Sequence, residues 1–169
     1  MKTSAASMRR RARSSRGQTL AEFAMILPVF TLLIFGVIDF ARMIQTYVTI
    51  QHSAREGARY AVTGRSDCGA ASPSRLACIE YIVERESSNL HNFDSLDVNI
   101  RSWAYQEGGY AATPTDDSAG IQCDNVEVAV TYDYEPMTPG IMKLFGTIPL
   151  AVSERLLNEP FGACGTVSG

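Results

Sequence analysis

The sequence predicts an α+β fold, in which a long N-terminal transmembrane helix continues outward and packs on a small three-stranded antiparallel sheet with a short helix. Three observations support this prediction. An apolar run of 19 residues follows a basic leader, and its helical period continues beyond the run. Three later segments alternate apolar and polar residues, as half-buried strands do. One segment between the long helix and these strands has the period of a short amphipathic helix.

The charged residues are unevenly distributed along the 169-residue chain. Residues 1–17 hold six of its 15 basic residues and none of its 18 acidic ones, namely Lys2, Arg9, Arg10, Arg11, Arg13 and Arg16. The leader therefore has a net charge of +6, and the remainder, with nine basic residues against 18 acidic ones, a net charge of −9. A basic segment directly before an apolar run keeps that end in the cytoplasm. The acidic remainder lacks the basic face that nucleic acids require, so we expect no nucleic-acid partner.

The apolar run extends from Leu20 to Ile38 and contains a single charged residue, Glu22. As a helix it would be about 28 Å long, close to the thickness of a bilayer's hydrocarbon core. A cleaved secretory signal is the alternative, but residues 39–43 (DFARM) lack the small-residue pattern of its cleavage site. We therefore expect a retained, single-pass helix over residues 18–39 in the bacterial inner membrane. Its N-terminus would be cytoplasmic and the C-terminal domain periplasmic.

The helical pattern continues over residues 40–64, as the outer half of the long helix. Apolar residues recur there every three or four positions: Phe40, Met43, Ile44, Tyr47, Ile50, Ala54, Ala58 and Ala61. Gly57 is a weak point because glycine has a low helix propensity, and Gly64 is expected to end the helix. Such a stripe needs a partner, either the chain's own outer domain or another subunit.

Residues 65–169 are expected to form a small periplasmic α+β domain. Ser74 precedes a segment of helical period, which predicts a helix over residues 75–88 capped by Ser74. Alternation of apolar and polar residues predicts three strands: residues 96–101, 126–134 and 148–156. Residues 106–120, rich in Gly, Pro and Asp, are expected to form a loop, and residues 141–145 a single helical turn.

All four cysteines lie after the apolar run: Cys68, Cys78, Cys123 and Cys164. This placement is typical of a domain exposed to an oxidising exterior such as the periplasm. Four cysteines allow three pairings, of which proximity in the sequence favours Cys68–Cys78 with Cys123–Cys164. There is no C-x-x-C motif, and the only histidines are His52 and His91, so we expect no metal site.

No set of residues in the sequence has the pattern of a catalytic site. His52 is expected on the solvent side of the outer helix, and His91 lies in a polar turn. Gly108 and Gly109 do not form a phosphate-binding pattern. We therefore expect no enzymatic activity and no cofactor, and a membrane-anchored enzyme is the least favoured of the hypotheses.

Between the leader and the apolar run stands the segment GQTLAEF, residues 17–23. It resembles a type IV prepilin processing site, where a membrane prepilin peptidase cuts after the glycine. The resemblance implies a cut between Gly17 and Gln18, with Glu22, followed by Phe23, as the fifth residue of the mature chain. It also implies that Glu22 is an assembly carboxylate, which pairs with the new amino group at Gln18 of a neighbouring subunit.

A wider stretch resembles the TadE-like proteins of the tight-adherence (Flp-type) pilus system. It comprises GQTLAEFAMILPVFTLLIFGVIDFARMI, residues 17–44, and QHSAREGARYAVTG, residues 51–64; residues 126–160 are similar to the family's last third to a lesser degree. The resemblance implies a minor pseudopilin that takes part in initiation or assembly of the pilus. Its partners would be the prepilin peptidase and other pilins and pseudopilins. The alternative is a bitopic membrane-anchored binding protein with a periplasmic domain.

Overall fold

The computed structural model describes residues 8–69, 74–106, 108–138, 140, 143, 146–159 and 164, with side chains from Gly17 onward. The chain divides into two units, the residues up to Ala41 and those from Arg42 onward. Each unit is described by itself below.

The first unit consists of the N-terminal part of helix α1, which as a whole runs from Met8 to Val62. The helix thus includes the end of the basic leader, because Arg and Ala favour helix and no Gly or Pro occurs between Met8 and Arg16. Pro28 lies inside α1 without ending it. Every large apolar side chain from Leu20 to Ile38 is exposed. A soluble protein would bury such a surface, so lipid or neighbouring helices must cover it.

The second unit contains the rest of α1 and all the other elements. They are α2 (Arg75–Ser87), the short 3₁₀ helix η1 (Phe93–Ser95), and the strands β1 (Leu96–Trp103), β2 (Tyr105–Gln106), β3 (Gly109–Tyr110), β4 (Thr115–Asp116), β5 (Asn125–Tyr134) and β6 (Ile148–Leu157). The predicted α+β class is confirmed. The predicted cap of α2 is also present, since the Ser74 side chain accepts a hydrogen bond from the Ala77 amide at 3.1 Å.

The main sheet has four antiparallel strands in the order β4-β1-β5-β6, where the sequence predicted three. The additional strand, β4, has two residues and pairs with Arg101 and Ser102 of β1. β2 and β3 form a separate two-stranded sheet. β3 and β4 fall in residues 106–120, which were predicted as a loop; strands of two residues have no alternation to detect. The helical turn predicted over residues 141–145 falls, apart from Lys143, outside the described residues.

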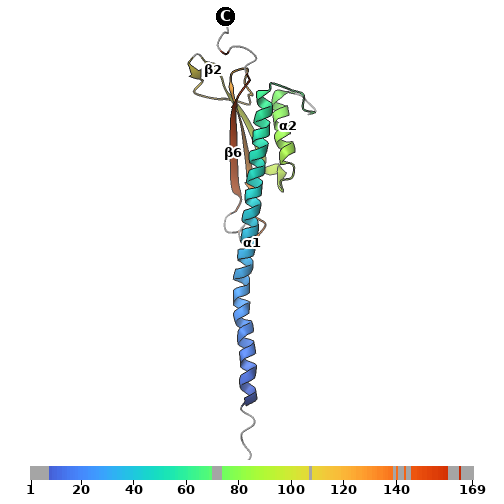
Figure 1. Ribbon diagram of the computed structural model, residues 1–169, viewed down its shortest axis with the longest axis vertical. Helices are drawn as coiled ribbons and strands as arrows, with labels where there is room; N and C mark the ends of the chain where they lie inside the picture. The colour runs from blue at the N-terminus through green and yellow to red at the C-terminus, as the bar shows by residue number, and fades with distance from the viewer. Residues whose placement is uncertain are drawn as a thin grey trace, which may run out of the picture. The chain divides into compact units, whose positions relative to one another are not determined.

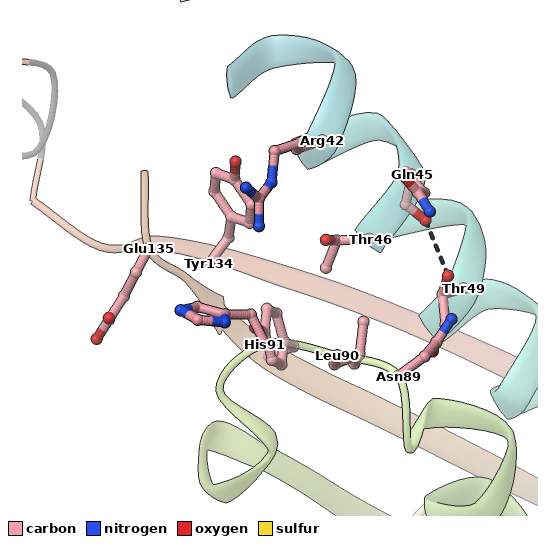
Figure 2. A pocket seen from close by; sticks show the side chains of 10 residues that line it. Arg42, Gln45, Thr46, Thr49, Asn89, Leu90, His91, Tyr134 and Glu135 are labelled. Carbon is pink, nitrogen blue, oxygen red and sulfur yellow. Dashed lines mark hydrogen bonds between the residues drawn. The ribbon is translucent and has the colours of Figure 1, made fainter. Parts of the chain in front are cut away.

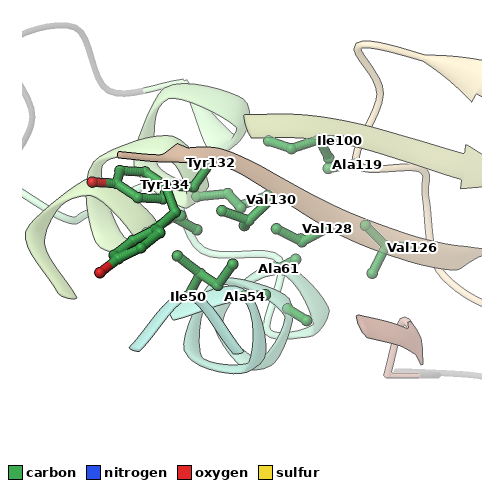
Figure 3. Close-up of a cluster of buried hydrophobic side chains, with 13 residues drawn as sticks. Ile50, Ala54, Ala61, Ile100, Ala119, Val126, Val128, Val130, Tyr132 and Tyr134 are labelled. Atoms are coloured by element: carbon green, nitrogen blue, oxygen red, sulfur yellow. The ribbon is translucent and has the colours of Figure 1, made fainter. Parts of the chain in front are cut away.

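The core of the second unit forms where α1 meets β5. Figure 3 shows α1 side chains directed at the valine and tyrosine side chains of one face of β5. The α1 members are Ile50, Ala54, Ala58 and Ala61, and those of β5 are Val126, Val128, Val130, Tyr132 and Tyr134. The sequence left open what covers the apolar stripe; the chain's own sheet covers it from Ile50 onward. Ile44 and Tyr47 remain 46% and 42% exposed.

Gly57 marks a close approach between α1 and α2, which lie side by side in Figure 1. A Cβ atom at this position would lie 2.5 Å from Cγ2 of Val83, and Val83 is fully buried. Sequence analysis identified Gly57 only as a weak point of the helix. The structure gives it a packing role, because even a methyl group would displace a stiff β-branched side chain.

We expect Gly57→Ala to lower the free energy of unfolding by about 1 kcal/mol, because overpacking costs about 1–3 kcal/mol and the gain in helix propensity returns up to about 1 kcal/mol. Thermal unfolding of the full chain in detergent, followed by fluorescence of Trp103, measures the change. Adding Val83→Ala should remove the clash, so the double variant should be more stable than the two single effects predict. A higher Tm for Gly57→Ala alone would refute the close contact.

Candidate functional site

The predicted processing residues lie on successive turns of α1. Gly17 is exposed, and a Cβ atom built on it would have no neighbour within 4 Å. A glycine inside a helix costs up to about 1 kcal/mol relative to alanine. At Gly57, close packing against Val83 explains why glycine is present despite this cost. At Gly17, neither packing nor backbone conformation among the described residues gives such a reason.

Glu22 lies one helical turn after Gln18, and Nε2 of Gln18 donates a hydrogen bond to Oε1 of Glu22 at 3.4 Å. Among the described residues, no basic side chain forms an ion pair with Glu22. Phe23, next to it, is 62% exposed. Among the side chains that the structure describes, which start at Gly17, Glu22 therefore has no cationic partner, and a largely apolar helical surface follows it.

The peptide bond between Gly17 and Gln18 lies inside helix α1, so its cleavage would change the hydrogen bonding of the helix. In an α-helix the amides of residues 18–21 donate to the carbonyls of residues 14–17. Cleavage at this bond would leave the amides of residues 19–21 without partners and would turn the amide of Gln18 into a positive amino group. A carboxylate in the first turn stabilises such a helix terminus. In the chain that would result, Glu22 is the fifth residue and lies one turn beyond Gln18, close to that terminus.

The comparison with protein families gives a match in this part of the chain. Residues 17–59 match the family described as TadE-like protein. This chain carries a TadE-like segment. The TadE-like segment begins at Gly17 and ends at Arg59, in the outer half of α1. Comparisons with curated proteins and with solved structures found no match.

The TadE-like family implies a role in the Tad pilus system and association with other components of that system. The apolar part of the TadE-like segment has a mean hydropathy of 2.3 and is long enough to cross a membrane. These properties agree with a membrane-anchored pilus component.

Two disulfides lie beyond the TadE-like segment. Cys68 is bonded to Cys78 and Cys123 to Cys164, with Cα–Cα distances of 5.4 and 5.7 Å. These are the pairs that proximity in the sequence favours. The first joins the segment after α1 to α2, and the second joins Cys164 to the turn before β5. In the described part of the chain, His, Cys, Asp and Glu side chains form no group of three that would hold a metal ion.

Sequence analysis missed a polar cluster around Arg75, the first residue of α2. Its guanidinium donates to the carbonyl of Ala61 from Nε (3.2 Å) and Nη2 (2.6 Å), and to the carbonyl of Gly120 from Nη1 (2.5 Å). Nη2 also donates to Oδ1 of Asn158 at 2.9 Å. Ala61 belongs to the last turn of α1, where carbonyls lack helical partners and a cation is favourable. Arg75 therefore joins α1, the loop before β5 and the end of β6.

Asn158 and Asp124 complete this cluster. Nδ2 of Asn158 donates to the carbonyls of Ala119 (2.9 Å) and Ile121 (2.8 Å). Asp124 is 6% exposed and accepts from the amides of Tyr105 and Ile121, both at 2.8 Å. Burial lowers the pKa of the Arg75 guanidinium, and the charge of Asp124 opposes this effect. No sequence signal groups these residues, because they lie on four separate segments.

The two histidines lie in different surroundings, although both are exposed. His52 is on the exposed side of α1, as expected. His91, in the turn after α2, is one of the residues that line a cavity (Figure 2). Arg42 and Glu135 line the same cavity. The sequence did not group these residues, because α1, the turn and the end of β5 are far apart along the chain.

Proposed function

We propose that this protein is a minor pseudopilin that takes part in initiation or assembly of a Flp/Tad-type pilus, and that a prepilin peptidase cleaves it between Gly17 and Gln18. The observation that supports this most is the exposed Gly17, which has no structural role in the helix. It is followed at the required spacing by Glu22, a carboxylate with no cationic partner among the described residues.

The proposed role of Glu22 follows from electrostatics. A carboxylate within a membrane is costly unless it is paired. The amino group created at Gln18 supplies a cation, and the Glu22 side chain of an adjacent subunit would pair with it. The two charges would neutralise each other, and their pairing would fix the register of neighbouring helices. Phe23 and the exposed apolar side chains that follow would pack between the helices.

The proposed topology places residues 1–17 in the cytoplasm and residues 18–39 across the inner membrane. Residues 40–64 and the domain of residues 65–169 would be periplasmic. The charge of the leader supports this orientation through the positive-inside bias. The two disulfides support it as well, because disulfides persist in an oxidising compartment.

Mass spectrometry of the chain purified from a host with active prepilin peptidase should show Gln18 as its first residue. Gly17→Val should leave the leader attached in essentially all molecules, because a β-branched side chain would block the residue at the cut. Gly36→Val is the matched control, since it changes another glycine of the same helix and should be processed normally. An intact leader on the native chain would favour the bitopic binding protein instead.

A further inference from the structure

A cavity of about 100 Å³ opens at one end of the second unit, between α1 and the turn that follows α2 (Figure 2). Its lining comes from three segments and is mainly polar: Arg42, Gln45, Thr46 and Thr49 of α1, Asn89, Leu90 and His91 of the turn, and Tyr132, Tyr134 and Glu135 at the end of β5. The pilus function proposed above does not use this cavity.

Arg42 supplies a cation to the cavity lining. Its Nη1 contacts the sulfur of Met137, which is a weak acceptor. Figure 2 shows the guanidinium beside the ring of Tyr134, with His91 on the facing wall. A guanidinium in this situation favours an oxyanion as its partner.

Glu135 is the one carboxylate among the lining residues. Its Oε1 accepts a hydrogen bond from Nδ2 of Asn92 at 3.4 Å, and in Figure 2 its carboxylate points away from Arg42. It therefore leaves the space between Arg42 and His91 to a ligand. The hydroxyl of Thr46 and the amide of Asn89 add donors around that space. Donors of this number and kind suit the several oxygens of a phosphate group.

The sequence indicates where such a phosphate would come from. Arg42 follows Ile38, the last residue of the apolar run, by four positions. In the proposed topology Arg42 therefore enters the headgroup region of the outer leaflet, where lipid phosphates are concentrated. We propose that this cavity binds the phosphodiester of an anionic glycerophospholipid, with Arg42 as the main contact and His91 as a second one. This inference depends on the orientation given under Proposed function.

The test uses the full chain purified in a neutral detergent. Dihexanoyl phosphatidylglycerol is titrated in, and the rise in Tm gives an apparent affinity. Arg42→Gln should weaken that affinity about tenfold or more, the factor expected for loss of a charge-assisted hydrogen bond. His91→Gln should weaken it by a smaller factor, and Glu135→Gln should leave it unchanged or strengthen it.

The chain offers a matched control for each variant. Arg59→Gln removes an arginine of α1 that pairs with Glu56, and His52→Gln removes the other histidine, which lies outside the cavity. Both should bind like the native chain. Loss of affinity in the controls as well, or none in Arg42→Gln, would overturn the proposal.

Two further ligands distinguish the source of the phosphate. Dihexanoyl phosphatidylcholine or inorganic phosphate that raised Tm as much as phosphatidylglycerol would overturn the assignment to an anionic lipid. The mass of the processed N-terminus is measured independently. If the chain begins at Gln18 but the lipid has no effect, the lipid site fails and the proposed pilus function stands.

Discussion

Replacing Glu22 by alanine is expected to abolish copurification of the chain with partner pilins, while membrane insertion and most cleavage persist. The alanine removes a charge from the apolar helix, so insertion becomes no less favourable. It leaves unchanged Gly17, the residue that the proposed peptidase would chiefly read. The amino group of an adjacent subunit would then be buried without its counter-charge, which costs about 3–5 kcal/mol, equivalent to a loss of affinity of at least about a hundredfold. Affinity purification from membranes, with partners detected by mass spectrometry, measures the effect.

Glu56→Ala is the appropriate control, because Glu56 is a carboxylate of the same helix with an ion pair of its own to Arg59 at 3.5 Å. It should copurify with partners as the native chain does. Normal copurification of Glu22→Ala would show that charge pairing does not hold the subunits together. Failure of both variants would point to a general defect of α1 instead.

Replacing Arg75 by methionine is expected to lower the free energy of unfolding by about 2–4 kcal/mol. Methionine keeps most of the apolar stem but leaves the carbonyls of Ala61 and Gly120 and the side chain of Asn158 without their donor. The guanidinium is only partly buried, and solvent access reduces the cost below that of a fully buried charge. Thermal unfolding of the oxidised full chain, followed by circular dichroism, measures the loss.

Arg85→Met tests whether the effect is specific to the cluster. Arg85 lies on the same helix, its side chain is 58% exposed, and it pairs with its neighbour Glu86 at 2.9 Å. Its replacement should change the free energy of unfolding by no more than about 0.5 kcal/mol, as is usual for surface positions. Equal losses for the two variants would show that the Arg75 contacts add nothing to the stability of the fold.

The sequence predicted the elements that local patterns determine. α2 begins directly after Ser74, as predicted, because an N-cap is a property of a few neighbouring residues. β1, β5 and β6 were found by alternation, which records burial of one face. β4 was missed because two residues have no period, and their pairing with β1 depends on contacts between distant segments. The Arg75 cluster and the close packing at Gly57 were also missed, because both depend on contacts between distant segments.

The candidate site could also be predicted only in part, because some of its features depend on neighbouring residues and others on contacts between distant segments. Gly17, Gln18 and Glu22 lie within six consecutive residues, so the motif is visible in the sequence. The structure adds that Gly17 has no packing role, which the sequence does not reveal. The cavity around Arg42 joins three segments separated by about 40 residues each, and only the folded chain brings them together.

The interface between α1 and β5 consists of isoleucine, alanine, valine and tyrosine side chains packed in one cluster, and Arg75 holds the last turn of the helix. A force directed along the helix axis would therefore load these contacts in shear, all together, rather than opening them one at a time. The same two elements would separate more readily under a force perpendicular to the axis. The outer domain is thus built to resist traction along its own helix, which is the direction in which a machine gripping that helix would pull.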